Sequence, residues 1–171
     1  MLIREENQKE QIIAEYKDDV VRLLRYLPWL SSKSGKDVTA MYTGDEKIQV
    51  IPIPVFDSTL MAFIKEVEKT KFADRNYPYV YSRNHIRTHE DEIRMLRNAK
   101  ITDMKLFRGI ISKYVLGGRT KAALWAEGVD SGIYTEALMR LNDLFFANTK
   151  ESTVLLSQVR SELRGGKNGE L

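Results

Sequence analysis

The sequence has no cysteine, only two histidines and only four prolines among its 171 residues. Without cysteine there is no disulfide, no thiol nucleophile and no thiolate-bound zinc. A chain of this length can bury a substantial core without such cross-links. The absence of cysteine also suits a reducing compartment, so we expect the protein to be cytoplasmic.

Long apolar runs are missing as well. No run of about 18 apolar residues, the length that crosses a bilayer as a helix, occurs anywhere in the chain. The N-terminal stretch "MLIREENQKEQ" is charged from Arg4 onward and lacks the apolar centre of a secretory signal. We therefore expect no contact with a membrane.

Neither sign of charge is in large excess, because the net charge is only +3. Residues 83–108 hold seven Lys and Arg against four Asp and Glu, and the rest of the chain is balanced. An excess of three charges supports a few phosphate contacts at most. Charge alone therefore gives weak support for a nucleic-acid partner.

Catalytic signatures are absent too. The sequence contains no nucleophile elbow, no Ser-His-Asp motif and no dinucleotide fingerprint. The stretch "LGGRTK" at 116–121 lacks the spacing of a phosphate-binding loop and follows a helical pattern. The sequence favours a protein that is not an enzyme, and it indicates no cofactor.

Helical periodicity dominates what is present, and it predicts a mainly α protein. The apolar pattern predicts a helix over 8–27 that Pro28 ends, a loop at 31–35, and a helix from Asp57 or Ser58 to about residue 71. Further helices are predicted after Thr102, from Thr120, after Gly132 and over 152–164. We expect one helical bundle over residues 1–164 and a flexible tail over 165–171.

A small β-hairpin insertion is predicted near residues 38–56. The stretches "VTAMY" and "KIQVIPIPVF" flank a turn signal, "TGDE", at 43–46. Pro52 and Pro54 have no N–H, so the second arm must be an edge strand or extended chain. Beyond it, the aromatic cluster "YPYVY" at 77–81 favours a wall of the core over a stacking platform.

The two histidines, His85 and His89, are four residues apart. On one continuous helix over 83–97 they would share a face and could hold a metal, with a carboxylate as third ligand. That face would also carry Ile93 and Leu96, which favours packed, hydrogen-bonded histidines instead. A metal-dependent hydrolase is therefore kept only as a third hypothesis.

The same helix would place four arginines together on its other side: Arg83, Arg87, Arg94 and Arg97. Such a stripe could bind phosphates. Glu90 lies in its middle, however, within ion-pairing reach of two of the arginines. The pattern is typical of a solvated face, and nucleic-acid binding remains the alternative.

The stretch "TKAALWAEGVDSGIYTEALM" at 120–139 resembles a helix-turn-helix DNA reader in outline. With Gly128 as the turn glycine, Leu124 stands where a small residue is needed and Glu127 where an apolar one is needed. These mismatches favour two short helices that meet at a glycine corner. A DNA-binding regulator using residues 120–140 remains the second hypothesis.

Residues 20–147 resemble an uncharacterised family of small, single-domain bacterial proteins. The resemblance rests on Leu24, Tyr26 and Pro28, on "IPIPVFDSTLMAFIKEV", and on a Gly-x-Arg…Leu-Trp-x-Glu signature. The signature residues are Gly117, Arg119, Leu124, Trp125, Glu127 and Gly132. The chain departs from the family pattern at Leu116, Thr120 and Lys121. The resemblance implies the fold and no activity.

Arg119 and Trp125 are the candidate binding residues. An arginine beside a helix end can satisfy free carbonyls and stack on an aromatic ring, which would make a structural corner. Trp and Arg are also favoured anchors at protein interfaces. The leading hypothesis is thus a non-enzymatic binding domain with a protein partner, in an oligomeric state that the sequence leaves open.

Overall fold

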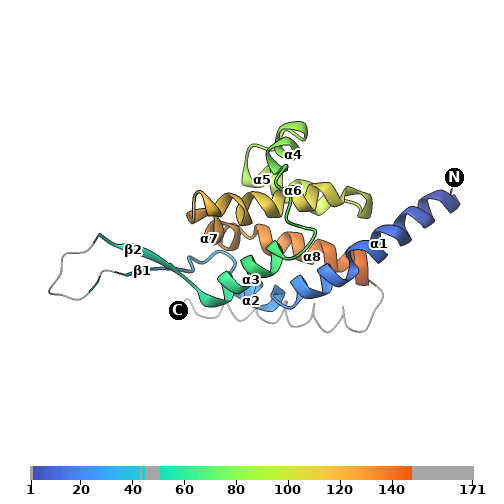
Figure 1. Ribbon diagram of the computed structural model, residues 1–171. Helices are drawn as coiled ribbons and strands as arrows, with labels where there is room; N and C mark the ends of the chain where they lie inside the picture. Colours follow the sequence, from blue (N-terminus) through green and yellow to red (C-terminus); the bar gives the residue numbers. More distant parts are fainter. Residues whose placement is uncertain (1, 43, 45–50, 148–171) are drawn as a thin grey trace, which may run out of the picture.

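The computed structural model describes residues 2–42, 44 and 51–147 of the chain. Figure 1 shows a body of packed helices from which a β-hairpin projects at one end and the start of the first helix at the other. The predicted mainly α fold with a small hairpin is confirmed. The predicted helix at 152–164, the predicted tail at 165–171 and, apart from Gly44, the predicted turn at 43–46 lie outside the described residues.

The described elements follow one another along the chain in the order α1 Leu2–Leu24, α2 Leu27–Lys33, β1 Thr39–Tyr42, β2 Ile53–Phe56, α3 Ser58–Glu68, α4 Tyr77–Arg83, α5 His89–Asn98, α6 Met104–Val115, α7 Ala123–Asp130 and α8 Ile133–Phe146. Two 3₁₀ turns, η1 Ile101–Asp103 and η2 Gly117–Arg119, flank α6. Within the described ranges, no helix has both the length and the apolar character needed to cross a bilayer.

Helices α6 and α8 form the centre of the body: α8 packs on α1, α2, α5, α6 and α7, and α6 packs on α3, α4, α5 and α7. Its Tyr134 is fully buried, with its ring centroid 5.0 Å from that of Phe63 and 5.9 Å from that of Tyr114. These edge-to-face contacts join α3, α6 and α8, and such aromatic pairs stabilise beyond the area they bury. The aromatic rings of the core thus connect α8 to α3 and α6.

Helix α3 agrees closely with its sequence pattern. Asp57 caps it by accepting a hydrogen bond from the Thr59 N–H at 2.7 Å, which satisfies one of the free donors at a helix start. The predicted apolar stripe is buried: Leu60, Phe63, Ile64 and Val67. The helix ends at Glu68, a few residues before the predicted end.

Two prolines begin helices instead of ending them. Pro28 lies in the first turn of α2 and Pro78 in the first turn of α4, where a missing N–H loses no hydrogen bond. The predictions that Pro28 ends a helix at Leu27 and that the loop begins at residue 31 are therefore wrong, since α1 ends at Leu24 and α2 continues to Lys33. In α4 Val80 is buried in the core and Tyr81 packs against it, whereas Tyr79 is exposed, so "YPYVY" forms part of the core wall on one side only.

Candidate binding site at the root of the hairpin

The hairpin presents two different faces. Its strands pair antiparallel, residue 39 opposite 56 through residue 42 opposite 53. Because side chains alternate between the faces of a sheet, one face carries Thr39, Met41, Pro54 and Phe56. We call this the cavity face. The opposite face, which we call the open face, carries Ala40, Tyr42, Ile53 and Val55.

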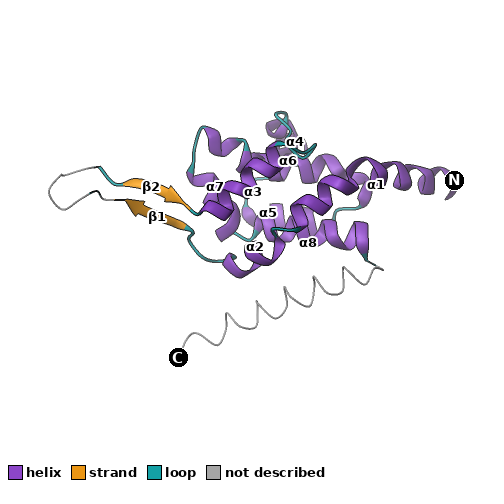
Figure 2. Cartoon of the chain, turned by 60° about the horizontal axis from the view of Figure 1, so that its bottom comes forward, coloured by secondary structure: helices purple, strands orange, loops and turns teal. Residues whose placement is uncertain are grey.

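The open face is apolar and uncovered. The side chains of Tyr42, Ile53 and Val55 are 57%, 53% and 49% exposed. The figures show the hairpin projecting away from the helices, so no described helix packs on this face (Figures 1 and 2). Clustered, exposed apolar side chains on a projecting element mark interaction surfaces more often than isolated ones do.

A cavity of about 340 Å³ lies between the cavity face and α7. Among the described residues, its lining includes three carboxylates, those of Asp37, Glu127 and Asp130, and no lysine or arginine. Lys36 precedes Asp37 in the chain but does not line the cavity. The root of the hairpin is therefore an acidic recess beside an apolar sheet.

Trp125, one of the two predicted binding residues, fastens the hairpin to the body. Its ring meets Phe56 edge-on at a centroid distance of 5.6 Å, and its Nε1 donates to the Val115 carbonyl at 2.8 Å. The ring lies flat against Gly118, where an added Cβ would stand 2.2 Å from it. Trp125 thus connects β2, α6 and α7, as the predicted structural corner requires.

Arg119, the other predicted residue, does not take part in this corner. Its Nε pairs with Glu68 Oε1 at 3.0 Å, and its side chain is 52% exposed. The prediction that Arg119 stacks on Trp125 is wrong, because the guanidinium turns toward α3 instead. This ion pair raises the pKa of Arg119 through its hydrogen bond to Glu68.

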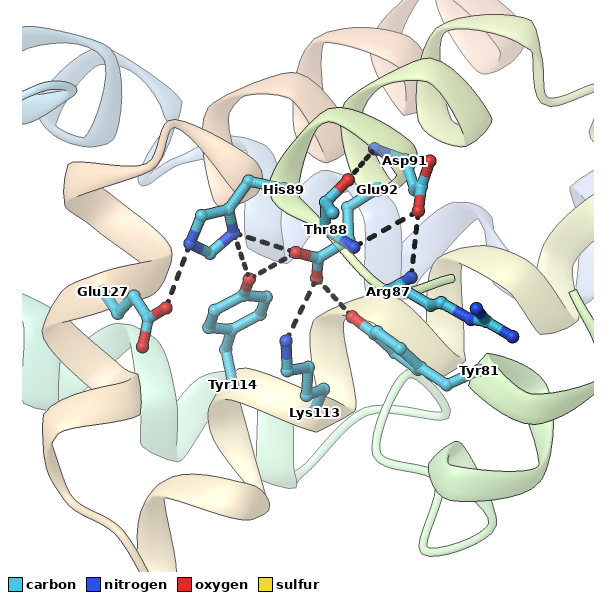
Figure 3. Close-up of polar contacts among 9 residues, drawn as sticks. All are labelled: Tyr81, Arg87, Thr88, His89, Asp91, Glu92, Lys113, Tyr114 and Glu127. Atoms are coloured by element: carbon cyan, nitrogen blue, oxygen red, sulfur yellow. Dashed lines mark hydrogen bonds and ion pairs between the residues drawn. The ribbon is translucent and has the colours of Figure 1, made fainter. Parts of the chain in front are cut away.

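Glu127 joins the cavity to a buried polar network that the sequence did not predict (Figure 3). Its Oε1 lies 3.0 Å from Nε2 of His89. On the other side of the ring, Nδ1 of His89 lies 2.9 Å from Oε1 of Glu92. The imidazole is therefore held between two carboxylates, one on α5 and one on α7.

Glu92 is the centre of this network and is only 1% exposed. Oε1 accepts a hydrogen bond from the Tyr114 hydroxyl at 2.7 Å, and Oε2 accepts one from the Tyr81 hydroxyl. Lys113 Nζ lies 3.7 Å from Oε2. A buried carboxylate is tolerated only when it is paired and hydrogen-bonded in this way.

Burial raises the pKa of both tyrosines that donate to Glu92. For Tyr114 and Tyr81 the main cause is desolvation, and the nearby Glu92 carboxylate adds to it, because ionising either hydroxyl would place a second negative charge beside the first. Both hydroxyls therefore stay protonated and act as donors. Together these contacts tie α4, α5, α6 and α7.

The cavity offers few groups for covalent chemistry. Of the network, only Glu127 lines it, and no serine, cysteine or lysine stands beside Glu127 as a nucleophile. A carboxylate that already contacts an imidazole is suited to holding a cation or accepting a hydrogen bond.

The proposed arginine stripe is divided by a break in the helix. Arg83 ends α4, Arg87 lies in the following turn, and α5 begins at His89 after a capping box formed by Thr88 and Asp91. The continuous helix over 83–97 that the stripe requires is therefore not formed.

Two of these arginines also have acidic partners. Arg94 Nη2 lies 3.0 Å from Asp91, and Arg97 Nη2 lies 2.6 Å from Glu136. Arg83 donates to the Tyr79 hydroxyl at 3.0 Å. The four side chains do not form one row, and two of them are neutralised, so this surface gives little support for phosphate binding.

The same break separates the two histidines. His85 lies in the turn after α4 with a φ of 52°, a conformation that non-glycine residues rarely adopt, whereas His89 opens α5. They do not share a helix face, and the geometric basis of the metal hypothesis is lost. In the described part of the chain, no three His, Asp or Glu side chains are grouped to hold a metal ion.

The helix-turn-helix outline also differs from the structure. Gly128 lies inside α7, packed against the Tyr134 ring, and the turn falls at Gly132, whose φ is 77°. On α8, Thr135 is 7% exposed and Glu136 pairs with Arg97. Arg140 Nε donates to the Ala99 carbonyl at 2.9 Å. The side chains that would face DNA are thus buried or already bonded.

No family model, curated protein or solved structure matches the chain. The site therefore has to be judged from its own geometry. Sequence reasoning missed Glu92, although one signal was present: Glu92 precedes the buried Leu96 by four residues, so both lie on one face of α5. For Glu127 and Asp37, nothing local indicated a shared cavity.

Proposed function

We propose that the protein is a non-enzymatic binding domain that docks a protein partner on its hairpin in the cytoplasm. The single observation that carries the proposal is the uncovered open face of the hairpin, with Tyr42, Ile53 and Val55 about half exposed. A partner that covered this face would remove apolar surface from water, which is the main driving force of association.

That gain is a substantial contribution to binding. Complete burial of an aliphatic or aromatic side chain stabilises by about 1.5–3 kcal/mol. Each of the three side chains is about half exposed, so covering it would contribute about 1 kcal/mol. Three such contributions correspond to roughly 100-fold in affinity, before any backbone hydrogen bonds are counted.

The shape of the hairpin supports a strand-like partner segment. The sheet has only two strands in the described residues, so each strand has an unpaired edge. Isolated two-stranded hairpins are marginally stable, and here the Phe56–Trp125 contact holds the root in place. Addition of a third strand would both extend the ladder and cover apolar side chains.

Affinity capture from an extract of the cells that make the protein tests this function. The wild-type chain is compared with an Ile53→Asp/Val55→Asp variant of the open face. The matched control is Leu2→Asp/Val21→Asp, which changes two exposed apolar residues on α1. We expect the wild type and the control to retain the same partner. The open-face variant should retain at least about tenfold less of that partner, because a charge cannot be buried there without cost.

A partner retained equally by the open-face variant would overturn the proposal. Thermal unfolding of all three proteins separates loss of binding from loss of fold. The substituted positions are exposed, so we expect the melting temperatures to agree within a few degrees.

A further inference from the structure

We infer that the docked partner segment is an extended strand that pairs with the outer edge of β1 and carries a lysine or arginine between two apolar residues. This inference rests on the proposed docking at the hairpin, and it adds the partner's conformation and charge. Three features of the hairpin root lead to it: the backbone donors, the alternation of side chains, and the acidic cavity.

The first feature is that β2 cannot accept a long partner strand. Pro52 and Pro54 have no N–H, so the outer edge of β2 lacks donors where a ladder would need them. The outer edge of β1 contains no proline. Strand addition is therefore directed to β1.

The pairing phase shows which β1 groups point outward. Opposite residues in an antiparallel pair alternate between exchanging two backbone hydrogen bonds and exchanging none. Pro54 lacks an N–H, so its pair with Met41 fits only the second kind. Thr39, two residues earlier, has the same phase, and its N–H donates to Asp37 Oδ1 at 2.9 Å instead of to β2. The Met41 N–H therefore points away from β2 and is available to a partner.

The second feature is the alternation of side chains in the added strand. A partner residue opposite Thr39 would place its side chain on the cavity face, because paired residues share a face. The residues before and after it would lie opposite Val38 and Ala40 and would place their side chains on the open face. One partner position thus enters the recess, and the neighbour opposite Ala40 covers apolar surface on the open face next to Tyr42.

The third feature is the charge of the recess. Asp37, Glu127 and Asp130 line it, and no lysine or arginine of the described ranges does. Of these, Glu127 already contacts His89, which leaves Asp37 and Asp130 to meet an incoming charge. An ammonium or guanidinium group complements this lining, whereas a carboxylate would be repelled. The apolar neighbours complement the open face.

Fluorescence anisotropy with the full chain and defined peptides tests the inference. The probes are three labelled peptides of the form Thr-Val-Xaa-Val-Thr-Val-Thr, in which Xaa is arginine, glutamine or glutamate. We expect the arginine peptide to bind about tenfold more tightly than the glutamine peptide, because each partly exposed carboxylate contributes a few-fold. The glutamate peptide should bind more weakly than both.

Two variants of equal charge locate the effect. Asp37→Asn/Asp130→Asn should reduce binding of the arginine peptide to the level of the glutamine peptide. Asp18→Asn/Asp143→Asn removes two carboxylates elsewhere and should change nothing. In addition, hydrogen exchange at the Met41 amide should slow when the arginine peptide binds to the wild-type chain.

The outcomes separate this inference from the proposed function. Three results would overturn the inference: equal affinity for all three peptides, no binding by any of them, or unchanged hydrogen exchange at the Met41 amide. None of them would contradict the proposed docking at the open face, which the capture experiment tests. Tight arginine-peptide binding that survives Ile53→Asp/Val55→Asp would instead count against the open face itself.

Discussion

Replacing Glu92 with leucine should destabilise the fold more than any surface substitution, because it removes the acceptor at the centre of the buried network. Glu92 is 1% exposed and receives both tyrosine hydroxyls. The Tyr114 side chain is fully buried, and its hydroxyl would keep only the contact with Nδ1 of His89, at 3.0 Å, once the carboxylate is lost.

The structure sets the expected magnitude. Loss of a hydrogen bond from a buried hydroxyl to a charged group, such as that from Tyr114 to Glu92, costs about 1.5–3 kcal/mol. His89 and Lys113, with side chains 45% and 31% exposed, can be solvated and add less. Removing one partner of a buried charged pair costs about 3–5 kcal/mol in total. We expect about that loss for Glu92→Leu, and about half for Glu92→Gln, which keeps one acceptor oxygen.

Urea unfolding measures these changes. Glu90→Gln on the same first turn of α5 is the matched control, because Glu90 is exposed and its loss should cost less than about 0.5 kcal/mol. A double-mutant cycle then tests the cause. Tyr114→Phe should cost about 1.5–3 kcal/mol in the wild type and clearly less in the Glu92→Leu background, where His89 is the partner that remains. Equal costs in both backgrounds would refute the reasoning.

The remaining predictions concern alkaline pH and the two residues that the sequence marked for binding. Burial raises the pKa of Tyr114 and Tyr134, so above about pH 10 the unfolded chain loses these protons while the folded chain keeps them. Their stabilising contribution is complete below that pH and falls by roughly 1.4 kcal/mol per pH unit for each tyrosine. The free energy of urea unfolding between about pH 8 and pH 11 should show this slope, and Tyr114→Phe should remove the part that one tyrosine contributes. An unchanged slope in Tyr114→Phe would contradict the raised pKa of Tyr114. For the second prediction, Trp125→Ala should cost about 3 kcal/mol through lost packing. Arg119→Ala should cost less than about 1 kcal/mol, because exposed ion pairs contribute little. The same unfolding assay measures both, and similar costs would argue against Trp125 as the residue that fastens the hairpin.

The mainly α fold could be predicted because most helices carry a strong local signal. Asp57 caps α3 and its apolar stripe repeats at helical spacing, so the pattern and the tertiary packing agree. Predictions failed where one local signal has two meanings. Proline ends a helix when it falls in the interior but begins one when it falls in the first turn, and periodicity does not distinguish these at Pro28.

The site could not be predicted to the same extent, because its parts are distant in sequence. Asp37 and Asp130 share a cavity although they lie far apart in the chain, and only packing of the hairpin on α7 brings them together. The sequence indicates His89 as a candidate metal ligand, but together with His85, because that hypothesis requires a single helix across 83–97. The capping box at Thr88 and Asp91 begins a new helix there and turns His89 toward Glu92 and Glu127.

The helix α7 is where stability and the proposed binding meet. Glu127 holds one end of α7 to the buried network through His89, and Trp125 holds the root of the hairpin through Phe56. The helix α8, which would have to read DNA, lies instead at the centre of the core. A partner needs surface that the fold leaves uncovered. In the described chain the hairpin combines free backbone donors, exposed apolar side chains and an adjacent charged recess on one short segment, which is why we place recognition there.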